Sequence, residues 1–148
     1  MKTYIPKVDE VQANRKWFLI DLKGKTLGRV AIEVANILRG KNKPIFSPHM
    51  DTGDYIIAIN ASQVVVTGNK AEQMKYYRYS GYPGGLYETS YARMMEKNPS
   101  FIFTNAVKGM LPKNRLGRKM IKKLHVYADD KHPHTAQQPE ELKMLESK

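Results

Sequence analysis

The stretch KWFLIDLKGKTLGRVAIEVANILRG, residues 16–40, decides the fold of this chain. Its first part, Lys16–Leu22, is a short apolar run rich in strand-forming side chains, which predicts a buried strand. The part that follows repeats apolar side chains at the spacing of one helix face: Leu27, Val30, Ala31, Val34 and Leu38. Thr26 suits the N-cap of this helix, and Gly40 suits the position just past its end.

A second apolar run, YIIAIN at residues 55–60, follows a loop that contains two prolines and a glycine. Its continuous apolar character indicates a strand buried on both faces. Strand, helix and strand in this order make a βαβ unit, whose strands are parallel. We therefore predict an α/β fold in which Trp17–Ile20 and Ile56–Ile59 are parallel strands and Leu27–Arg39 is the crossover helix.

The 148 residues are most simply one domain, spanning residues 1–148, and they are enough to bury a core. From Lys131 onward the sequence is polar and ends acidic, so we expect residues 131–148 to be an extended tail. The absence of cysteine fits a reducing compartment, and we find neither a membrane-spanning run nor a targeting signal. The net charge of +11 points to a polyanion, with nucleic acid favoured over an anionic membrane surface.

Much of the excess positive charge lies in one segment, residues 108–128, which contains seven Lys or Arg and no Asp or Glu. Four of these cations have spacings that place them largely on one side of a helix: Arg118, Lys119, Lys122 and Lys123. Cations without neighbouring acids repel one another unless an external anion compensates them. We therefore predict that the segment binds a polyanion, in preference to forming a solvated basic helix, and that Lys108, Lys113 and Arg115 extend its surface.

The segment YYRYSGYPGGLYETSY, residues 76–91, contains six of the nine tyrosines and is rich in glycine, so we do not expect regular structure there. The tyrosines could close a small core, or they could offer rings and hydroxyls to bases and phosphates. We expect about half of them to be structural. Tyr76, Tyr77, Arg78 and Tyr79 lie next to Lys75, which suits RNA contact.

The triplet GKT at residues 24–26 is similar to the end of a phosphate-binding P-loop. That loop needs a glycine five positions earlier, where this chain has Leu19, so nucleotide hydrolysis is not supported. A helix start flanked by Lys23, Lys25 and Arg29 could still bind an anion, although ordinary capping with solvated side chains explains it equally well.

The triplet DTG at residues 51–53 is similar to the active-site triplet of aspartic proteases, which need a pair of aspartates. Only one triplet is present, so we interpret it as a turn in which aspartate side chains bond nearby backbone amides. A metal site at His49 and its neighbouring aspartates lacks the further ligands that a shell requires. His49 is expected to contact an RNA phosphate or only its own loop.

Several long stretches carry a resemblance: DTGDYIIAINASQVVVTGNK, YYRYSGYPGGL, VKGMLPKNRLGRKMIKKLHVYA and HPHTAQQP. With KTLGRVA they span most of Trp17–Pro139. In these stretches the chain closely resembles the large-subunit ribosomal protein L-thirteen family in its bacterial form. The resemblance implies a compact three-layer α/β/α domain around a small, mainly parallel four-stranded sheet.

The same resemblance implies a cytoplasmic, non-enzymatic protein of the large ribosomal subunit that binds large-subunit rRNA and supports assembly. Its expected partners are this rRNA and neighbouring large-subunit proteins, with no cofactor, metal, membrane or small-molecule substrate. The residues expected to contact RNA are Lys23, Lys25, Arg29, His49, Lys75, Tyr76, Tyr77, Arg78, Lys108, Lys113, Arg115, Arg118, Lys119, Lys122 and Lys123. The alternative is a small phosphate- or nucleotide-dependent α/β enzyme that uses the helix start at Thr26.

Overall fold

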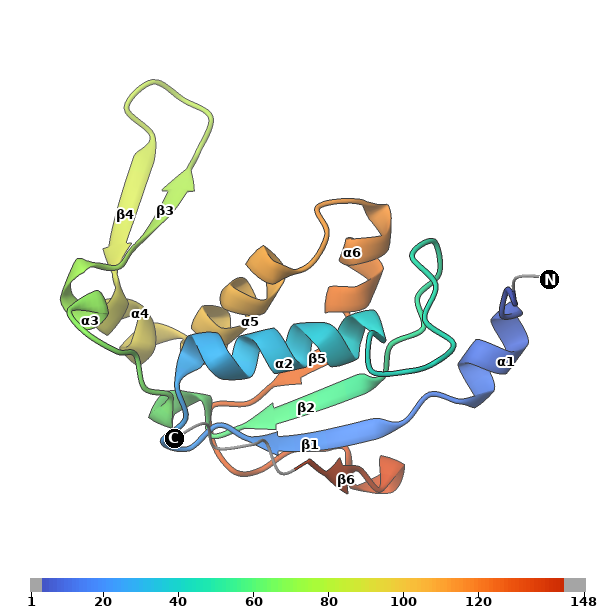
Figure 1. Ribbon diagram of the computed structural model, residues 1–148. Helices are drawn as coiled ribbons and strands as arrows, with labels where there is room; N and C mark the ends of the chain where they lie inside the picture. Colours follow the sequence, from blue (N-terminus) through green and yellow to red (C-terminus); the bar gives the residue numbers. More distant parts are fainter. Residues whose placement is uncertain (1–3, 143–148) are drawn as a thin grey trace.

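The computed structural model describes residues 4–142 and has an α/β fold around a four-stranded parallel sheet (Figure 1). Its strands are β1 (Trp17–Asp21), β2 (Tyr55–Ile59), β5 (Leu124–Val126) and β6 (Glu140–Glu141). Their order is β5-β2-β1-β6, and every neighbouring pair is parallel. The predicted parallel pairing of the two apolar runs is confirmed, with Trp17 beside Tyr55.

Helix α2 (Leu27–Arg39) is the predicted crossover between β1 and β2. It ends as expected at Gly40, whose left-handed conformation (φ 82°) favours glycine. Thr26 occupies the N-cap position, but its side chain makes no capping hydrogen bond. Instead, the amide of Leu27 donates to the carbonyl of Val65 at 2.9 Å, which ties the start of the helix to the chain that follows β2.

Three helices cover one face of the sheet: α2, α5 (Pro99–Met110) and α6 (Arg115–Ile121). Their apolar sides pack against the strand residues that point toward them and form one core. Its largest buried side chains include Phe103, Ile20 and Ile56, none of which is more than 1% exposed. Burial of this apolar surface is the main contribution to folding, and it fixes where the three helices stand.

The opposite face of the sheet carries an aromatic and histidine cluster. The rings of Trp17 and Tyr55 stack with centroids 4.3 Å apart, and the His134 ring lies 4.7 Å from that of His125. The hydroxyl of Tyr127 and Nε2 of His134 are hydrogen-bonded at 2.8 Å. Burial lowers the pKa of His125, and the neighbouring His134 lowers it further. This third layer is thin, because it consists of extended chain and the 3-10 turn η2 (Thr135–Gln137) in place of a long helix.

Part of the expected tail over residues 131–148 lies against the body of the domain. Glu140 and Glu141 pair with Phe18 and Leu19 as the edge strand β6. The Nζ of Lys16 also lies 3.1 Å from the carboxylate of Glu140. Residues 131–142 therefore run back along the sheet, while residues 143–148 of the expected tail lie outside the described residues.

The tyrosine-rich segment forms regular structure, contrary to our expectation. Strands β3 (Lys75–Tyr79) and β4 (Leu86–Ser90) make an antiparallel hairpin that projects from the body (Figure 1). The remaining elements are α1 (Val8–Ala13), η1 (Ala61–Gln63), α3 (Lys70–Gln73) and α4 (Tyr91–Lys97). Glycines at the tip, including Gly81 (φ 90°) and Gly84 (φ 71°), supply the left-handed turns that join the two strands.

Candidate nucleic-acid interface

Helices α5 and α6, with the turn between them, carry six exposed cations that together we call the α5–α6 patch: Lys108, Lys113, Arg115, Arg118, Lys119 and Lys122. The turn between the two helices is rigid. Asn114 caps α6 by accepting a hydrogen bond from the amide of Gly117 at 2.8 Å, and a Cβ on Gly117 would overlap the carbonyl of Pro112. Among residues 4–142, none of the six cations takes part in an ion pair.

Lys123 does not belong to this surface, which corrects the prediction that it lies there with its neighbours. Helix α6 ends at Ile121 and the chain turns inward toward β5. Lys123 is only 4% exposed, and its Nζ donates to the carbonyl of Leu38 at 3.0 Å and to the carboxylate of Asp51. Burial lowers the pKa of Lys123, while the bond to Asp51 opposes that shift. Lys123 is therefore a structural cation that is already satisfied inside the protein.

The DTGD segment, residues 51–54, connects distant parts of the chain. Asp51 accepts a hydrogen bond from Arg15 at 3.3 Å in addition to the one from Lys123. Asp54 is 1% exposed, accepts the backbone amide of Lys16 at 2.9 Å and pairs with Lys43. We expected these carboxylates to bond amides of their own turn, but their partners lie elsewhere in the chain. Each aspartate is held by cations, an arrangement unlike the proton-sharing pair of an aspartic protease.

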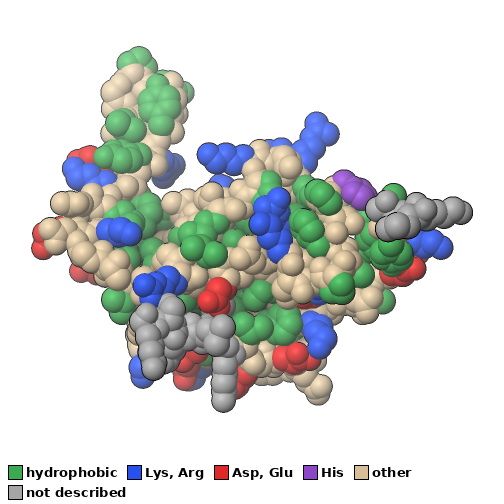
Figure 2. Space-filling view, in the orientation of Figure 1, with side chains coloured by type: hydrophobic (Ala, Val, Ile, Leu, Met, Phe, Trp, Pro, Cys, Tyr) green, Lys and Arg blue, Asp and Glu red, His purple; other side chains and the backbone are tan. Residues whose placement is uncertain are grey.

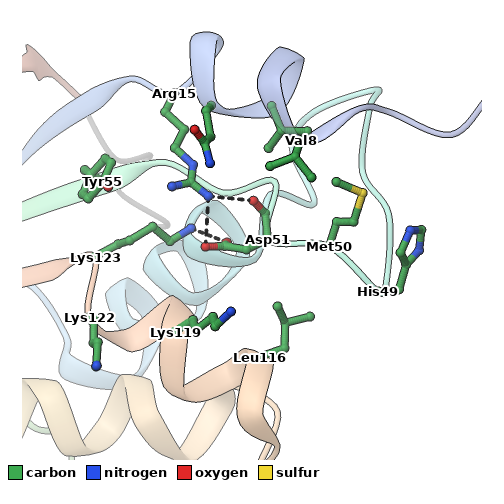
Figure 3. Close-up of a pocket in the computed structure, with 12 residues that line it drawn as sticks. Val8, Arg15, His49, Met50, Asp51, Tyr55, Leu116, Lys119, Lys122 and Lys123 are labelled. Carbon is green, nitrogen blue, oxygen red and sulfur yellow. Dashed lines mark hydrogen bonds and ion pairs between the residues drawn. The ribbon is translucent and has the colours of Figure 1, made fainter.

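An open groove of about 460 Å³ lies between α1, the loop before β2 and α6 (Figure 3). His49, from the loop before β2, lines the same groove as Lys119 and Lys122, so predicted contact residues from two distant segments border one hollow. Arg15 and Tyr55 also line the groove, and the Arg15 guanidinium lies 6.0 Å from the centre of the Tyr55 ring. Sequence reasoning missed these two, because neither stands in a basic or tyrosine-rich stretch.

The hairpin separates the predicted contacts of residues 75–78 into inward and outward groups. Tyr76 packs edge-on against Phe101, and burial raises the pKa of its phenol. Tyr77 and Arg78 are exposed. Lys75 is exposed as well, but its Nζ pairs with Glu88 at 3.2 Å. Tyr76 therefore anchors the hairpin, and the residues beyond it present rings and a guanidinium to solvent.

The sequence model of the family described as "Ribosomal protein L13" matches residues 15–133, from the strand β1 region through the α5–α6 patch. The chain belongs to the ribosomal protein L13 family. A curated relative, "Large ribosomal subunit protein uL13" of Bordetella petrii, is 60% identical over 142 residues, which cover 96% of this chain and 99% of the relative.

Other L13-family relatives agree. The protein of the same name from Thermoanaerobacter pseudethanolicus is 56% identical, with 96% of this chain and 98% of the relative covered. That from Alcanivorax borkumensis is also 56% identical, with 97% of this chain and all of the relative covered. Membership of the L13 family places the chain among ribosomal proteins and not among enzymes.

The start of α2 fits this classification and not a nucleotide site. The amides of Gly24, Lys25 and Leu27, which a phosphate would need, donate to protein carbonyls at 2.9–3.1 Å. Lys23 shares its hollow with three acids, Asp21, Asp129 and Asp130. Lys25 is half-buried and Arg29 is exposed. These three predicted contacts lie at the N-terminal end of α2, a helix of 13 residues that is about 20 Å long.

Within residues 4–142, no helix has the length and apolar character needed to cross a bilayer. The same range contains no group of three or more His, Cys, Asp or Glu side chains placed to hold a metal ion.

Proposed function

We propose that this L13-family protein is a structural component of the large ribosomal subunit in the cytoplasm, where it binds large-subunit rRNA and supports subunit assembly. Its relatives are named as proteins of that subunit. The observation that carries the proposal is the α5–α6 patch, in which six exposed cations have no ion pair among the described residues. Such a surface is stabilised when phosphates replace its counterions.

The arrangement of the surfaces supports a role in holding RNA segments together. The hairpin and the turn between α5 and α6 project from the same side of the body (Figure 1). On that side, Figure 2 shows Lys and Arg side chains gathered beside the hairpin. Tyr77 adds a stacking face and Arg78 adds a guanidinium, which suit an unpaired RNA strand. Phosphates bound at both places would bring two backbone segments close together.

The full proposed contact set has a principal and a subsidiary part. The principal part is the α5–α6 patch with His49, Lys75, Tyr77 and Arg78, while Tyr76 supports the hairpin from its base. The subsidiary part is Lys23, Lys25 and Arg29 at the start of α2, where neighbouring acids weaken the attraction for phosphate. Neighbouring large-subunit proteins are the second class of partner.

The test compares two triple variants of the full chain that lose the same charge. The first replaces Arg118, Lys119 and Lys122 by glutamine, and the control replaces Lys41, Lys97 and Lys131, which are exposed but scattered. Binding to a large-subunit rRNA transcript is measured at several salt concentrations, beside thermal unfolding of the free proteins. Each lost phosphate contact should lower the log–log salt slope by about 0.7 for single strands and about 0.9 for duplex.

The first variant should therefore bind more weakly, and its log–log salt slope should fall by the amount expected for up to three lost phosphate contacts. Its melting temperature should hardly change, because the altered side chains face solvent. The control should keep most of the wild-type slope. Equal losses in the two variants would show that only net charge matters. An unchanged slope in the first variant would remove the α5–α6 patch from the interface.

A further inference from the structure

Gly109 lies near the end of α5, and no contact within the described residues requires a glycine there. Glycine is the least favourable helix residue after proline, and in a folded domain it is usually explained by a close neighbour. At Gly117 this explanation holds, because a Cβ would overlap the carbonyl of Pro112. At Gly109 no described atom other than those of its chain neighbours and its own helix backbone lies within 4 Å of the position a Cβ would occupy, and the backbone is helical. The space beside Gly109 is therefore open in the free protein.

That space is part of a hollow of about 420 Å³ between α5 and α6. It is lined by Asn105, Lys108, Gly109, Leu111, Pro112, Lys113, Gly117, Arg118 and Ile121. The lining contains three cations and no carboxylate, and its floor is made by aliphatic side chains and glycine. A binding site for a small group commonly has this composition, an apolar floor with a few polar groups that fix orientation.

The walls of the hollow are already fixed before anything binds. Leu111 is 4% exposed and belongs to the main core, so the turn cannot swing outward without opening that core. Its amide donates to the carbonyl of Val107 at 3.1 Å, which holds it to the end of α5. The cap at Asn114 and the close contact at Gly117 fix α6 on the other side. A ligand would therefore meet a preformed surface, which lowers the ordering cost of binding.

We propose that this hollow binds one unstacked nucleotide of the rRNA, with its base on the apolar floor and its flanking phosphates at the cationic rim. Leu111, Pro112 and Ile121 provide the floor, and Asn105 supplies an amide that can donate to and accept from a base edge. Lys108, Lys113 and Arg118 neutralise the phosphates on either side. The missing side chain at Gly109 leaves room for the ribose and backbone to approach α5.

A nucleotide fits this hollow better than an acidic peptide for two reasons. RNA-binding proteins read single-stranded loops by taking splayed-out bases onto aromatic rings or arginine guanidinium planes, and the Arg118 guanidinium lines this hollow. The bases also bring a phosphate on each side, which matches cations on more than one edge of the hollow. This inference rests on the proposed rRNA-binding function, and it adds to that function a contact that does not depend on charge.

The test fills the hollow without changing any charge. Gly109→Leu places a good helix former in the open space, and Ala92→Leu adds the same side chain to an exposed position of α4 outside the hollow. Binding of each variant to a large-subunit rRNA transcript is measured at several salt concentrations, and thermal unfolding of the free proteins is measured in parallel. Gly109→Leu should bind about tenfold or more weakly, because the base can no longer bury its apolar surface in the hollow. Its salt slope and melting temperature should not fall.

The affinities of the variants distinguish a failure of the base-binding hollow from a failure of the proposed rRNA binding. Wild-type affinity in Gly109→Leu, together with the expected loss in the Arg118/Lys119/Lys122 variant, would overturn the base-binding hollow and leave rRNA binding intact. Weak, salt-independent RNA binding by the unaltered protein would instead overturn the proposed function itself. Ultraviolet crosslinking of the wild-type complex gives a second measurement. Nucleotide adducts on Leu111–Lys113 support the hollow, and adducts confined to the hairpin contradict it.

Discussion

Lys122 and Lys123 are neighbours in the sequence but belong to two different regions of the molecule. Lys122 is exposed at the end of α6, in the α5–α6 patch, and takes part in no ion pair within residues 4–142. Lys123 is buried and is held by Asp51 and the carbonyl of Leu38. The same type of side chain is therefore open to solvent in one region and held inside the fold in the other.

The difference follows from where the charge is compensated. A buried ammonium loses its water, which costs several kcal/mol unless an acid and other acceptors replace it. The Asp51 region, by which we mean Asp51 with Arg15 and Lys123, supplies those replacements inside the protein (Figure 3). An exposed lysine keeps its water, so it has little effect on stability and remains available to an external phosphate.

The largest expected effect is that of removing the shared acid. Asp51→Asn leaves Arg15 and Lys123 close together without their carboxylate, so the free energy of unfolding should fall by about 3–5 kcal/mol. Urea denaturation measures this change. Asp130→Asn, at an exposed acid, is the control and should change the value by less than about 0.5 kcal/mol. A similarly small loss in Asp51→Asn would show that the Asp51 region contributes nothing to the fold.

A smaller effect is expected when the two adjacent lysines are compared directly. Methionine keeps most of the aliphatic stem but removes the charge and the donors. Lys123→Met should lower the free energy of unfolding by about 1–3 kcal/mol, because the Leu38 carbonyl loses a donor while Asp51 still has Arg15. Lys122→Met should cost less than about 0.5 kcal/mol.

The binding measurements on the same two variants should show the reverse order. Lys122→Met should lower the salt slope of rRNA binding by about one phosphate contact, roughly 0.7–0.9. Lys123→Met, compared under conditions where it is folded, should leave that slope unchanged. If both variants changed stability and slope alike, the separation between the two regions would be wrong.

The smallest effect is expected where a cation is both exposed and paired. Lys75 and Glu88 lie diagonally across the hairpin, with Nζ 3.2 Å from the carboxylate, and both side chains are about half exposed. Glu88→Gln should change the free energy of unfolding by no more than about 1 kcal/mol, and the difference should shrink in 1 M salt because the charges are screened. Affinity for rRNA should rise slightly as Lys75 is released. A large, salt-independent loss of stability would place this pair with the Asp51 region instead.

The parts of the fold that sequence predicted are those determined by local pattern. The apolar side chains of α2 recur on one face, and Gly40 stops the helix through its backbone conformation, so both the helix and its end were foreseen. The parallel pairing of β1 with β2 followed from the crossover between them. In the candidate site, the exposure of Arg118, Lys119 and Lys122 agreed with helical spacing.

The parts that sequence did not predict depend on contacts between distant residues. Helical spacing placed Lys123 at the surface, but α6 had already ended at Ile121, and the acid that accepts it comes from the loop before β2. Strand β6 consists of two glutamates, whose pairing with β1 uses backbone groups and leaves no hydrophobic pattern. The role of Arg15 was missed for the same reason, because its partner Asp51 is 36 positions away.

The strand order β5-β2-β1-β6 has a consequence for how the chain assembles as it leaves a ribosome. The two central strands are the first to be synthesised, and the two edges come last. Each edge strand therefore pairs with a central strand that has already been synthesised, and no late strand has to insert between two early ones. The exception is the outer side of β1, whose partner near Glu140 emerges 124 positions after Lys16. During that interval β1 has an unprotected edge, the kind of surface at which growing chains associate wrongly.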